Sequence, residues 1–451
     1  MNSLRIAFVP LVRNTFDVPL AQEMIVQARR QLLAAGFELL EPSEPVSDIA
    51  AALKQAQYLA GEAIDLLLIF QATFADSSMA AALTEHCDVP VFLWAIPEPW
   101  TGGRLRLNSL CGINLAGHAL TLRHRKYDYA YGLPQDPDVM KKIRAMAAAG
   151  QLNRRLKSAR LGVVGEHPAG MDSCNLDEPQ LKKVFGLQIA RIDLSEVFAR
   201  ARSISGKSLE KTRAALDRQL DNLADLDQVP LQGTLSVYNA LKEIASEKKL
   251  DGLAVRCWPE FFTEMGCAAC GAMSMLSDGF GNCVPLPTSC EADINGTVTQ
   301  LMLQWLSGSP AFGTDMVGVD VEKDRIALWH CGLAPLSMAD PNVQAHGTIH
   351  SNRNVPLVFD FPLKAGTVTV ARLSQASGSL RLVLGRGEML AEPKPFSGTA
   401  GTLKLDLPAS KFLNLLMHKG LEHHISVTYG DYVQELTAYA ELINLPVILM
   451  Q

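Results

Sequence analysis

Short, continuous apolar runs that alternate with amphipathic helical segments constrain the fold of this chain more than any other feature. In the first 160 residues the apolar runs are Leu4–Pro10, Leu66–Phe70 and Val89–Ile96, and Ala21–Ala35 has helical spacing of its apolar residues. Strands that are apolar along their whole length are buried on both faces, which is typical of parallel sheets covered by helices. The pattern predicts a doubly wound α/β domain over residues 1–159.

The same pattern starts again after the charged segment Gln151–Lys157. Arg160–Glu166 indicates a new first strand, Leu250–Cys257 indicates a further strand, and Val298–Leu306 indicates a helix. We therefore expect a second doubly wound α/β domain over residues 160–310.

From about residue 311, short β-rich runs follow one another without helices between them, which is typical of an antiparallel sheet or small barrel. These runs are Val317–Val321, Arg325–His330, Val355–Phe361, Thr367–Ser374, Ser379–Glu388 and Gly401–Leu407. The predicted fold class is thus α/β, with two doubly wound domains followed by a C-terminal antiparallel, β-rich and barrel-like domain over residues 311–451.

Composition narrows the possible partners and the compartment. Of the 451 residues, 48% are hydrophobic and 20% are charged, so the chain can bury a sizeable core. A net charge of −6 without a basic stripe argues against a nucleic-acid partner. The sequence has neither an apolar run of membrane-spanning length nor the features of a signal peptide. We expect a soluble, cytoplasmic protein with no membrane partner, and the nine cysteines are too few for a disulfide scaffold.

Two acidic motifs stand where predicted strands end, which is where α/β sheets bind ligands. They are Arg256-Cys-Trp-Pro-Glu260 and Cys290-Glu-Ala-Asp293. Acids at a helix start can simply complement the helix dipole, and that alternative stays open for both motifs. Clustered carboxylates repel each other unless a cation or a proton separates them, so the two motifs together indicate a divalent metal.

Histidines and cysteines add weaker signals. The pair His423-His424 enters a predicted strand, and two carboxylates with one imidazole suit manganese or another octahedral cation. His330 ends another strand, where a core histidine is the plainer interpretation. The spacing Cys267-Ala-Ala-Cys270 lacks the second pair of a zinc site, so we expect small buried residues there.

Together these motifs resemble the L-fucose isomerase and L-arabinose isomerase superfamily, in particular its shorter, fucose-isomerase-like members. The resemblance rests on Arg256–Glu260, Glu291–Asp293 followed by Asn295-Gly-Thr, Trp329–Gly332, Glu422–His424 with Tyr429-Gly-Asp431, and Asn108–Asn114. It implies an aldose–ketose isomerase that acts on an open-chain sugar through an enediol or enediolate, with a divalent metal, commonly manganese. It also implies a homo-oligomer, either a trimer or a hexamer.

The resemblance carries the family's functional residues to particular positions. Glu260 and Asp293 match the two carboxylate ligands, one of them acting as the catalytic base, and His424 matches the histidine ligand. Glu291 in place of Asp293, and His423 in place of His424, remain alternatives for the metal ligands.

Further residues are candidates for contacts with the sugar. In the second and third predicted domains they are Arg256, Trp258, Glu291, His330 and His423, and in the first, which can close a neighbouring subunit's pocket, they are Arg13, Trp94 and Asn108. The arginines suggest a modified, anionic sugar as the substrate.

Two other functions compete with an isomerase. A two-lobed sugar-binding or regulatory protein without chemistry would also show two α/β patterns, but it needs no acidic metal cluster. A cysteine-based racemase would use two thiols on facing domains, with Cys111, Cys257 and Cys267 as candidates.

Overall fold

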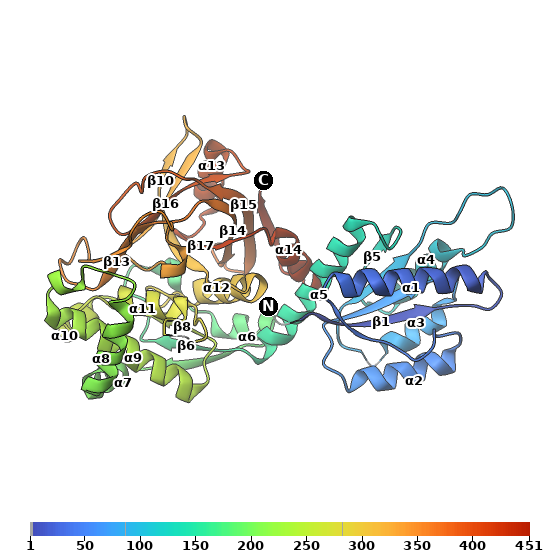
Figure 1. Ribbon diagram of the computed structural model, residues 1–451, viewed down its shortest axis with the longest axis horizontal. Helices are drawn as coiled ribbons and strands as arrows, with labels where there is room; N and C mark the ends of the chain where they lie inside the picture. Colours follow the sequence, from blue (N-terminus) through green and yellow to red (C-terminus); the bar gives the residue numbers. More distant parts are fainter. Residues whose placement is uncertain (1–2, 86, 282) are drawn as a thin grey trace. The chain divides into compact units, whose positions relative to one another are not determined.

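The computed structural model of the protein describes residues 3–85, 87–281 and 283–451. The chain forms two compact units. The first comprises the residues up to Arg155 together with Gln434–Asn444, and the second comprises Leu156–Val433 together with Leu445–Gln451. Figure 1 colours the chain from blue to red along the sequence. The predicted domain limits at residues 159 and 310 stay predictions.

A five-stranded parallel sheet, in the order β2-β1-β3-β4-β5, is the centre of the first unit. Its strands are β1 (Arg5–Leu11), β2 (Glu38–Leu40), β3 (Leu66–Gln71), β4 (Val91–Ala95) and β5 (Tyr127–Tyr131). The helices are α1 (Val18–Ala34), α2 (Ile49–Ala60), α3 (Ser77–Thr84), α4 (Ser109–Leu122), α5 (Pro137–Ser158) and α14 (Val433–Leu442). Helices α1 and α2 lie on opposite sides of the sheet (Figure 1). This is a doubly wound order, as the apolar runs predict.

Local sequence explains where these helices begin and end. Asp17, Asp48 and Asp76 each cap a helix, because their side chains accept hydrogen bonds from backbone N–H groups of the first turn. The charged segment 151–157, which the sequence presents as a break between domains, is instead the last part of the long helix α5.

The second unit begins with a four-stranded parallel sheet in the order β7-β6-β8-β9. Its strands are β6 (Arg160–Val164), β7 (Gln188–Ile192), β8 (Gly252–Val255) and β9 (Thr288–Ser289). The helices here are α6 (Glu178–Phe185), α7 (Leu194–Ser203), α8 (Gly206–Leu216), α9 (Gln228–Lys248), α10 (Glu260–Glu264), α11 (Ala269–Asp278) and α12 (Ile294–Ser307).

Six antiparallel strands then close into a barrel in the order β16-β11-β10-β17-β14-β15, with β15 pairing back to β16. They are β10 (Phe312–Asp320), β11 (Arg325–His330), β14 (Gly366–Ser374), β15 (Arg381–Met389), β16 (Thr399–Leu405) and β17 (His424–Tyr429). Short strands β12 (His346–Thr348), β13 (Val358–Pro362) and β18 (Val447–Met450), and helix α13 (Ala409–Lys419), complete the region. The fold class predicted from the sequence is confirmed.

One continuous hydrophobic core joins the parallel sheet of the second unit to the barrel. It includes Val164 and Val255 from the sheet, Phe312 and Val427 from the barrel, and Met273 from α11. Helix α12 packs against β8 on one side and against β14 and β17 on the other (Figure 1). The loops at the strand ends of the sheet are therefore held against barrel strands, and the candidate site is built there.

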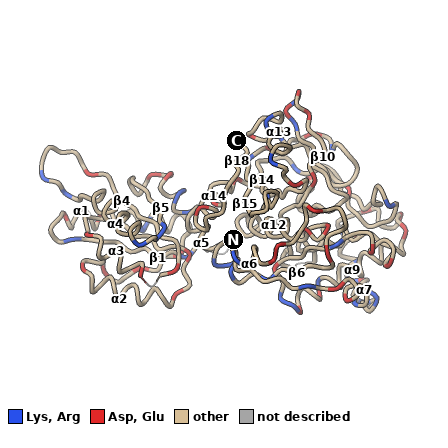
Figure 2. Tube along the Cα trace, turned by 180° about the vertical axis from the view of Figure 1, so that it is seen from behind, with Lys and Arg blue, Asp and Glu red and all other residues tan. Residues whose placement is uncertain are grey.

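Charges of both signs are interspersed along the chain, as Figure 2 shows. Among the described residues, no helix combines the length and the apolar character that crossing a bilayer requires.

Candidate active site

The loops that follow β8 and β9 bring a tryptophan and a carboxylate together. A disulfide joins Cys257, after β8, to Cys290, after β9. Trp258 Nε1–H donates a hydrogen bond of 3.2 Å to Glu291 Oε1. Glu291 and the next residue, Ala292, both have left-handed backbones, with φ of 58° and 55°. Two successive non-glycine residues in that region are unusual and are typical of functional sites, where surrounding contacts hold the strain.

Asp293 is fully buried and holds three groups at once. Its Oδ1 accepts the backbone N–H of Gly296 at 3.0 Å, which caps α12. Its Oδ2 lies 2.9 Å from His424 Nδ1 and 2.5 Å from Arg372 Nη1. Burial disfavours the charged carboxylate, but Arg372 and His424 outweigh that penalty and hold the pKa of Asp293 far below its usual range. Asp293 is thus an ionised anchor that orients His424.

The barrel places two more ionisable groups beside His424. Pairing of β10 with β17 and with β11 sets Asp315 opposite both His424 and Trp329. His424 Nε2 lies 3.3 Å from Asp315 Oδ1 and 3.7 Å from Glu291 Oε2. The His330 ring centroid lies 6.2 Å from that of His424. Nδ1 of His424 thus faces one carboxylate, and Nε2 faces two others.

The protonation states follow from these contacts. Burial disfavours the charged form of His424, but its hydrogen bond to Asp293 and its close contact with the Asp315 carboxylate outweigh this and raise its pKa. Burial likewise opposes ionisation of Asp315 and Glu291, yet the neighbouring histidines lower both pKa values. Burial also lowers the pKa of His330. The cluster therefore pairs ionised carboxylates with imidazoles in a site that is largely shielded from water.

The donor set suits a divalent cation. Asp315, His330 and His424 offer ligand atoms within 4.8 Å of one another, and so do Cys174, Glu291 and His424. Among the described residues, the buried Oδ1 of Asp315 makes no well-aligned hydrogen bond, so it remains open to a cation. The Asp293–His424 contact matches the carboxylate–imidazole pairing that fixes the tautomer of metal-binding histidines.

Glu291, Asp315 and His330 of this cluster line a pocket with a volume of about 220 Å³. Trp258, Trp329 and Phe262 supply aromatic walls, while Glu291, Asp315 and His330 supply the acid–base groups. The pocket offers room for one small polar molecule beside the carboxylates.

Comparison with known proteins agrees with this chemistry. The model of the fucose/sulfoquinovose isomerase N-terminal domain matches residues 7–157, and that of the L-fucose isomerase C-terminal domain matches residues 358–451. Sulfoquinovose isomerases of Alkalicoccus urumqiensis and Priestia megaterium (strain ATCC 12872 / QMB1551) are each 31% identical to the chain over 449 residues, 99% of each protein. That of Clostridium sp. (strain MSTE9) is 28% identical over the same length. The chain belongs to the fucose/sulfoquinovose isomerase family.

It is accordingly an aldose–ketose isomerase, as the sequence motifs predict, and not the sugar-binding protein without chemistry that competed with this interpretation. The positions of the three cysteines considered for a cysteine-based racemase also do not match that hypothesis. Cys257 is bonded to Cys290, Cys267 is fully buried, and Cys111 lies in the first unit.

The structure of the isomerase gathers most, but not all, of the residues that the sequence singles out. Asp293, Glu291, Trp258, His330 and His424 meet at the cluster. His423 joins them, with Nε2 3.6 Å from Glu291 Oε2. Glu260 instead begins α10 and forms a two-point ion pair with Arg256, at 2.8 Å and 2.7 Å. Neither Glu260 nor Arg256 lines the pocket.

Three predicted substrate contacts lie in the first unit. Arg13 forms an ion pair with Asp76. Trp94 is fully buried and donates Nε1–H to the Gly132 carbonyl at 3.0 Å. Asn108 has a left-handed backbone, and its N–H donates to Glu98.

Sequence reasoning missed Asp315, Arg372 and Arg353. Arg372 is the one charged residue of β14, and that contrast is a signal that could have identified it, whereas Asp315 shares β10 with Asp320 and stands out less. Arg353 lies in a polar loop and carries no comparable signal.

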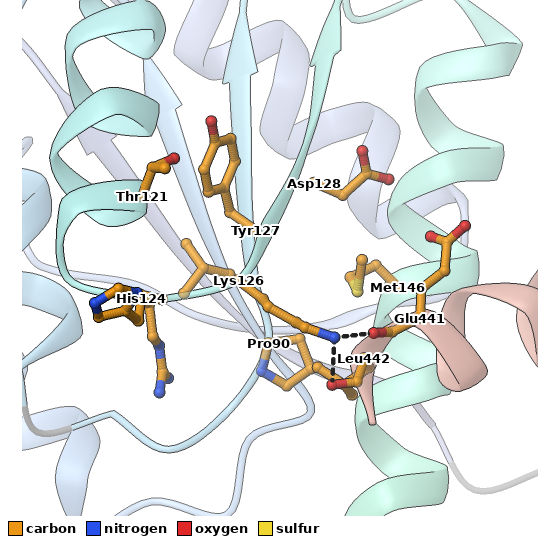
Figure 3. A pocket seen from close by; sticks show the side chains of 11 residues that line it. Pro90, Thr121, His124, Lys126, Tyr127, Asp128, Met146, Glu441 and Leu442 are labelled. Carbon is orange, nitrogen blue, oxygen red and sulfur yellow. Dashed lines mark hydrogen bonds between the residues drawn. The ribbon is translucent and has the colours of Figure 1, made fainter. Parts of the chain in front are cut away.

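The first unit contains a larger hollow of about 590 Å³, shown in Figure 3, at the edge of the sheet where β4 and β5 begin. Lys126 Nζ points across it and donates to the backbone carbonyls of Glu441 and Leu442, at the end of α14. A cation at the C-terminal end of a helix is stabilising. The ammonium group at this hollow therefore ties α14 to the sheet.

Proposed function

We propose that this isomerase converts an open-chain anionic aldose into its ketose with the help of a divalent cation, and that sulfoquinovose, a glucose derivative with a C6 sulfonate, is its substrate type. The names of its full-length relatives support the anionic sugar. The observation that carries the proposal is the pair of carboxylates, Glu291 and Asp315, that line the pocket and face Nε2 of His424.

Asp315, His330 and His424, whose ligand atoms lie within 4.8 Å of one another, are the residues that would hold the cation, for which we expect manganese. Asp293 orients His424 through Nδ1 and so leaves Nε2 directed at the carboxylates. When bound, such a cation polarises the sugar oxygens on C1 and C2 and makes the hydrogen on C2 more acidic.

We assign proton transfer to Glu291. Trp258 holds its Oε1, while Oε2 faces the interior of the cluster. The carboxylate takes the proton from C2 of the aldose while the C1 oxygen gains one, which gives an enediol. Return of the proton to C1, with loss of the proton on O2, completes the ketose. Asp293 is less suited to this work, because Arg372, His424 and the cap of α12 occupy both of its oxygens.

This proposal gives Glu260 no ligand role, since Arg256 already neutralises its carboxylate. Contacts from Arg13, Trp94 and Asn108 of a neighbouring subunit, in a trimer or hexamer, stay predictions that rest on the family resemblance.

The test is product analysis with the manganese-loaded enzyme in D₂O. Sulfoquinovose, glucose 6-phosphate and glucose are incubated in parallel, and ketose formation is followed by NMR. We expect conversion of sulfoquinovose with deuterium on C1 of the product, and no conversion by Glu291→Gln. Glu243→Gln, at an exposed glutamate on α9, is the control and should behave like the wild type. Conversion of glucose alone would contradict the anionic substrate, and conversion of no aldose would contradict the proposed reaction.

A further inference from the structure

The loop between β12 and β13 lines the same pocket as the carboxylate cluster, through His350, Asn352 and Arg353. The loop is held by its own hydrogen bonds: the backbone N–H groups of Arg353 and Asn354 donate to the His350 carbonyl at 3.1 Å and 2.8 Å. His350 Nδ1 accepts the N–H of Asn352 at 3.2 Å. Since Nδ1 is the acceptor, Nε2 of neutral His350 carries the proton and is a donor. Burial lowers the pKa of His350, which favours this neutral form.

Arg353 differs from the arginines near the cluster because it has no counter-charge. Arg256 pairs with Glu260, and Arg372 pairs with Asp293. Among the described residues, no carboxylate oxygen lies within 4 Å of the Arg353 guanidinium. Its central carbon lies 5.6 Å from the centroid of the Phe262 ring, a cation–π contact that orients the side chain over a pocket wall. Its guanidinium is therefore available to bind an anionic ligand.

A series of side-chain contacts along the pocket wall leads from the carboxylates to Arg353. His330, beside the carboxylate cluster, contacts Cys331 at 3.2 Å from Nδ1 to Sγ. Cys331 groups with Cys270 and His350, whose ligand atoms all lie within 4.8 Å of one another. The His350 ring meets the Phe262 ring edge to face at 5.3 Å, and Phe262 is the ring beneath Arg353. The pocket wall thus extends from the carboxylates of Glu291 and Asp315 to the guanidinium of Arg353.

This polarity fits an anionic sugar in one orientation. Glu291 and Asp315 repel an anion, so the charged end of the substrate must lie away from them. The planar fork of an arginine binds the oxygens of a tetrahedral anion through two parallel hydrogen bonds. Amide and imidazole N–H groups can donate to the remaining oxygens.

We propose that Arg353, together with the Asn352 amide and His350 Nε2–H, forms the subsite that holds the anionic group of the sugar, while C1 and C2 lie at Glu291 and Asp315. This inference rests on the proposed function and identifies the residues that give the enzyme its preference for an anionic sugar. A sulfonate and a phosphate share the chemistry that this subsite recognises, so the test includes both.

The test compares Arg353→Gln and Arg353→Lys with wild type, using kcat and KM for sulfoquinovose, glucose 6-phosphate and glucose. Loss of a charge-assisted hydrogen bond corresponds to a KM increase of about 10- to 100-fold for Arg353→Gln. We expect this increase for the anionic sugar that wild type prefers, with kcat within about twofold and with glucose unaffected. Arg353→Lys should recover part of the loss, because it keeps the charge without the fork.

Arg218→Gln is the matched control, because this arginine is exposed in the second unit and lies outside the pocket. An unchanged KM in Arg353→Gln, or an equal loss for glucose and sulfoquinovose, would overturn the subsite. The preferred sugar decides between sulfonate and phosphate.

Binding measurements separate this inference from the proposed reaction. Sulfoquinovose is titrated calorimetrically into manganese-loaded Glu291→Gln, with and without Arg353→Gln. If wild type turns over no sugar but binding depends on Arg353, the subsite stands and the proposed reaction fails. If sulfoquinovose does not bind, or binds equally to both variants, the subsite is wrong.

Discussion

The carboxyl edges of the two parallel sheets carry similar residues but use them differently. At the first sheet, Arg13 pairs with Asp76, Arg106 pairs with Asp17, and Glu98 accepts three backbone N–H groups, so the charges fasten loops. At the second sheet, Glu291 faces histidines supplied by barrel strands. A strand end with charged residues is therefore not sufficient for a site. Asp293 and Glu260 at the second edge still pair with arginines, so the difference lies in Glu291, which contacts histidines that the barrel supplies.

The largest expected effect comes from removing the carboxylate of Asp315, which strand β10 of the barrel supplies. Asp315→Asn takes away the carboxylate that faces Nε2 of His424, so we expect bound manganese to be lost and kcat/KM to fall by about 10²- to 10⁴-fold. Metal analysis of the purified variant and its turnover of sulfoquinovose measure both effects. Chelation of wild type, followed by addition of Mn²⁺, should remove and restore activity. Full activity after complete chelation would contradict the requirement for a divalent cation.

Asp293→Asn tests the anchor behind His424. A carboxylate that holds the second ring nitrogen of a metal-binding histidine typically contributes about 10- to 100-fold to affinity or activity, and we expect a loss of that size. The change also removes the charge of the closer of two buried carboxylates beside Arg372, Asp293 and Glu422, so the thermal midpoint should fall. Manganese titration separates the two roles, since a lower midpoint with unchanged manganese affinity would show that Asp293 is only structural.

At the first sheet, Glu98→Gln tests whether the charges there are structural. The carboxylate accepts the N–H groups of Arg106, Leu107 and Asn108, and its neutralisation should cost roughly 1 kcal/mol of stability. Thermal unfolding measures the shift. We expect manganese content to equal that of wild type. A loss of manganese would contradict the claim that the charges at the first sheet are only structural.

Glu260→Gln should have the smallest effect. The Arg256–Glu260 pair is part-exposed and joins the residue after β8 to the first residue of α10, so it contributes about 0–1 kcal/mol. Denaturation midpoints of Glu260→Gln and Arg256→Gln should therefore lie close to that of wild type. Loss of manganese from Glu260→Gln alone would restore the ligand role that the motif suggests.

The sequence predicts the fold class because buried parallel strands and amphipathic helices leave clear apolar patterns. It also singles out Glu291, Asp293 and His424 by their motifs at strand ends, and the structure brings them into one cluster, while their roles stay predictions. It does not reveal Asp315, because the pairing of β10 with β17 joins residues 109 positions apart, and strand register cannot be derived from periodicity. The motif also singles out Glu260 as a ligand, whereas the structure pairs its carboxylate with Arg256 of the same motif, in the loop between β8 and α10. Its ligand role stays a prediction.

Side-by-side exchange of the C2 hydrogen of sulfoquinovose in D₂O tests the central claim most directly. Wild type, Glu260→Gln and Glu291→Gln are loaded with manganese and followed by NMR. The account predicts exchange by wild type and Glu260→Gln at similar rates, and none by Glu291→Gln. Exchange that persists in Glu291→Gln and disappears in Glu260→Gln would contradict it, because the reaction would then depend on the carboxylate that the structure pairs with Arg256.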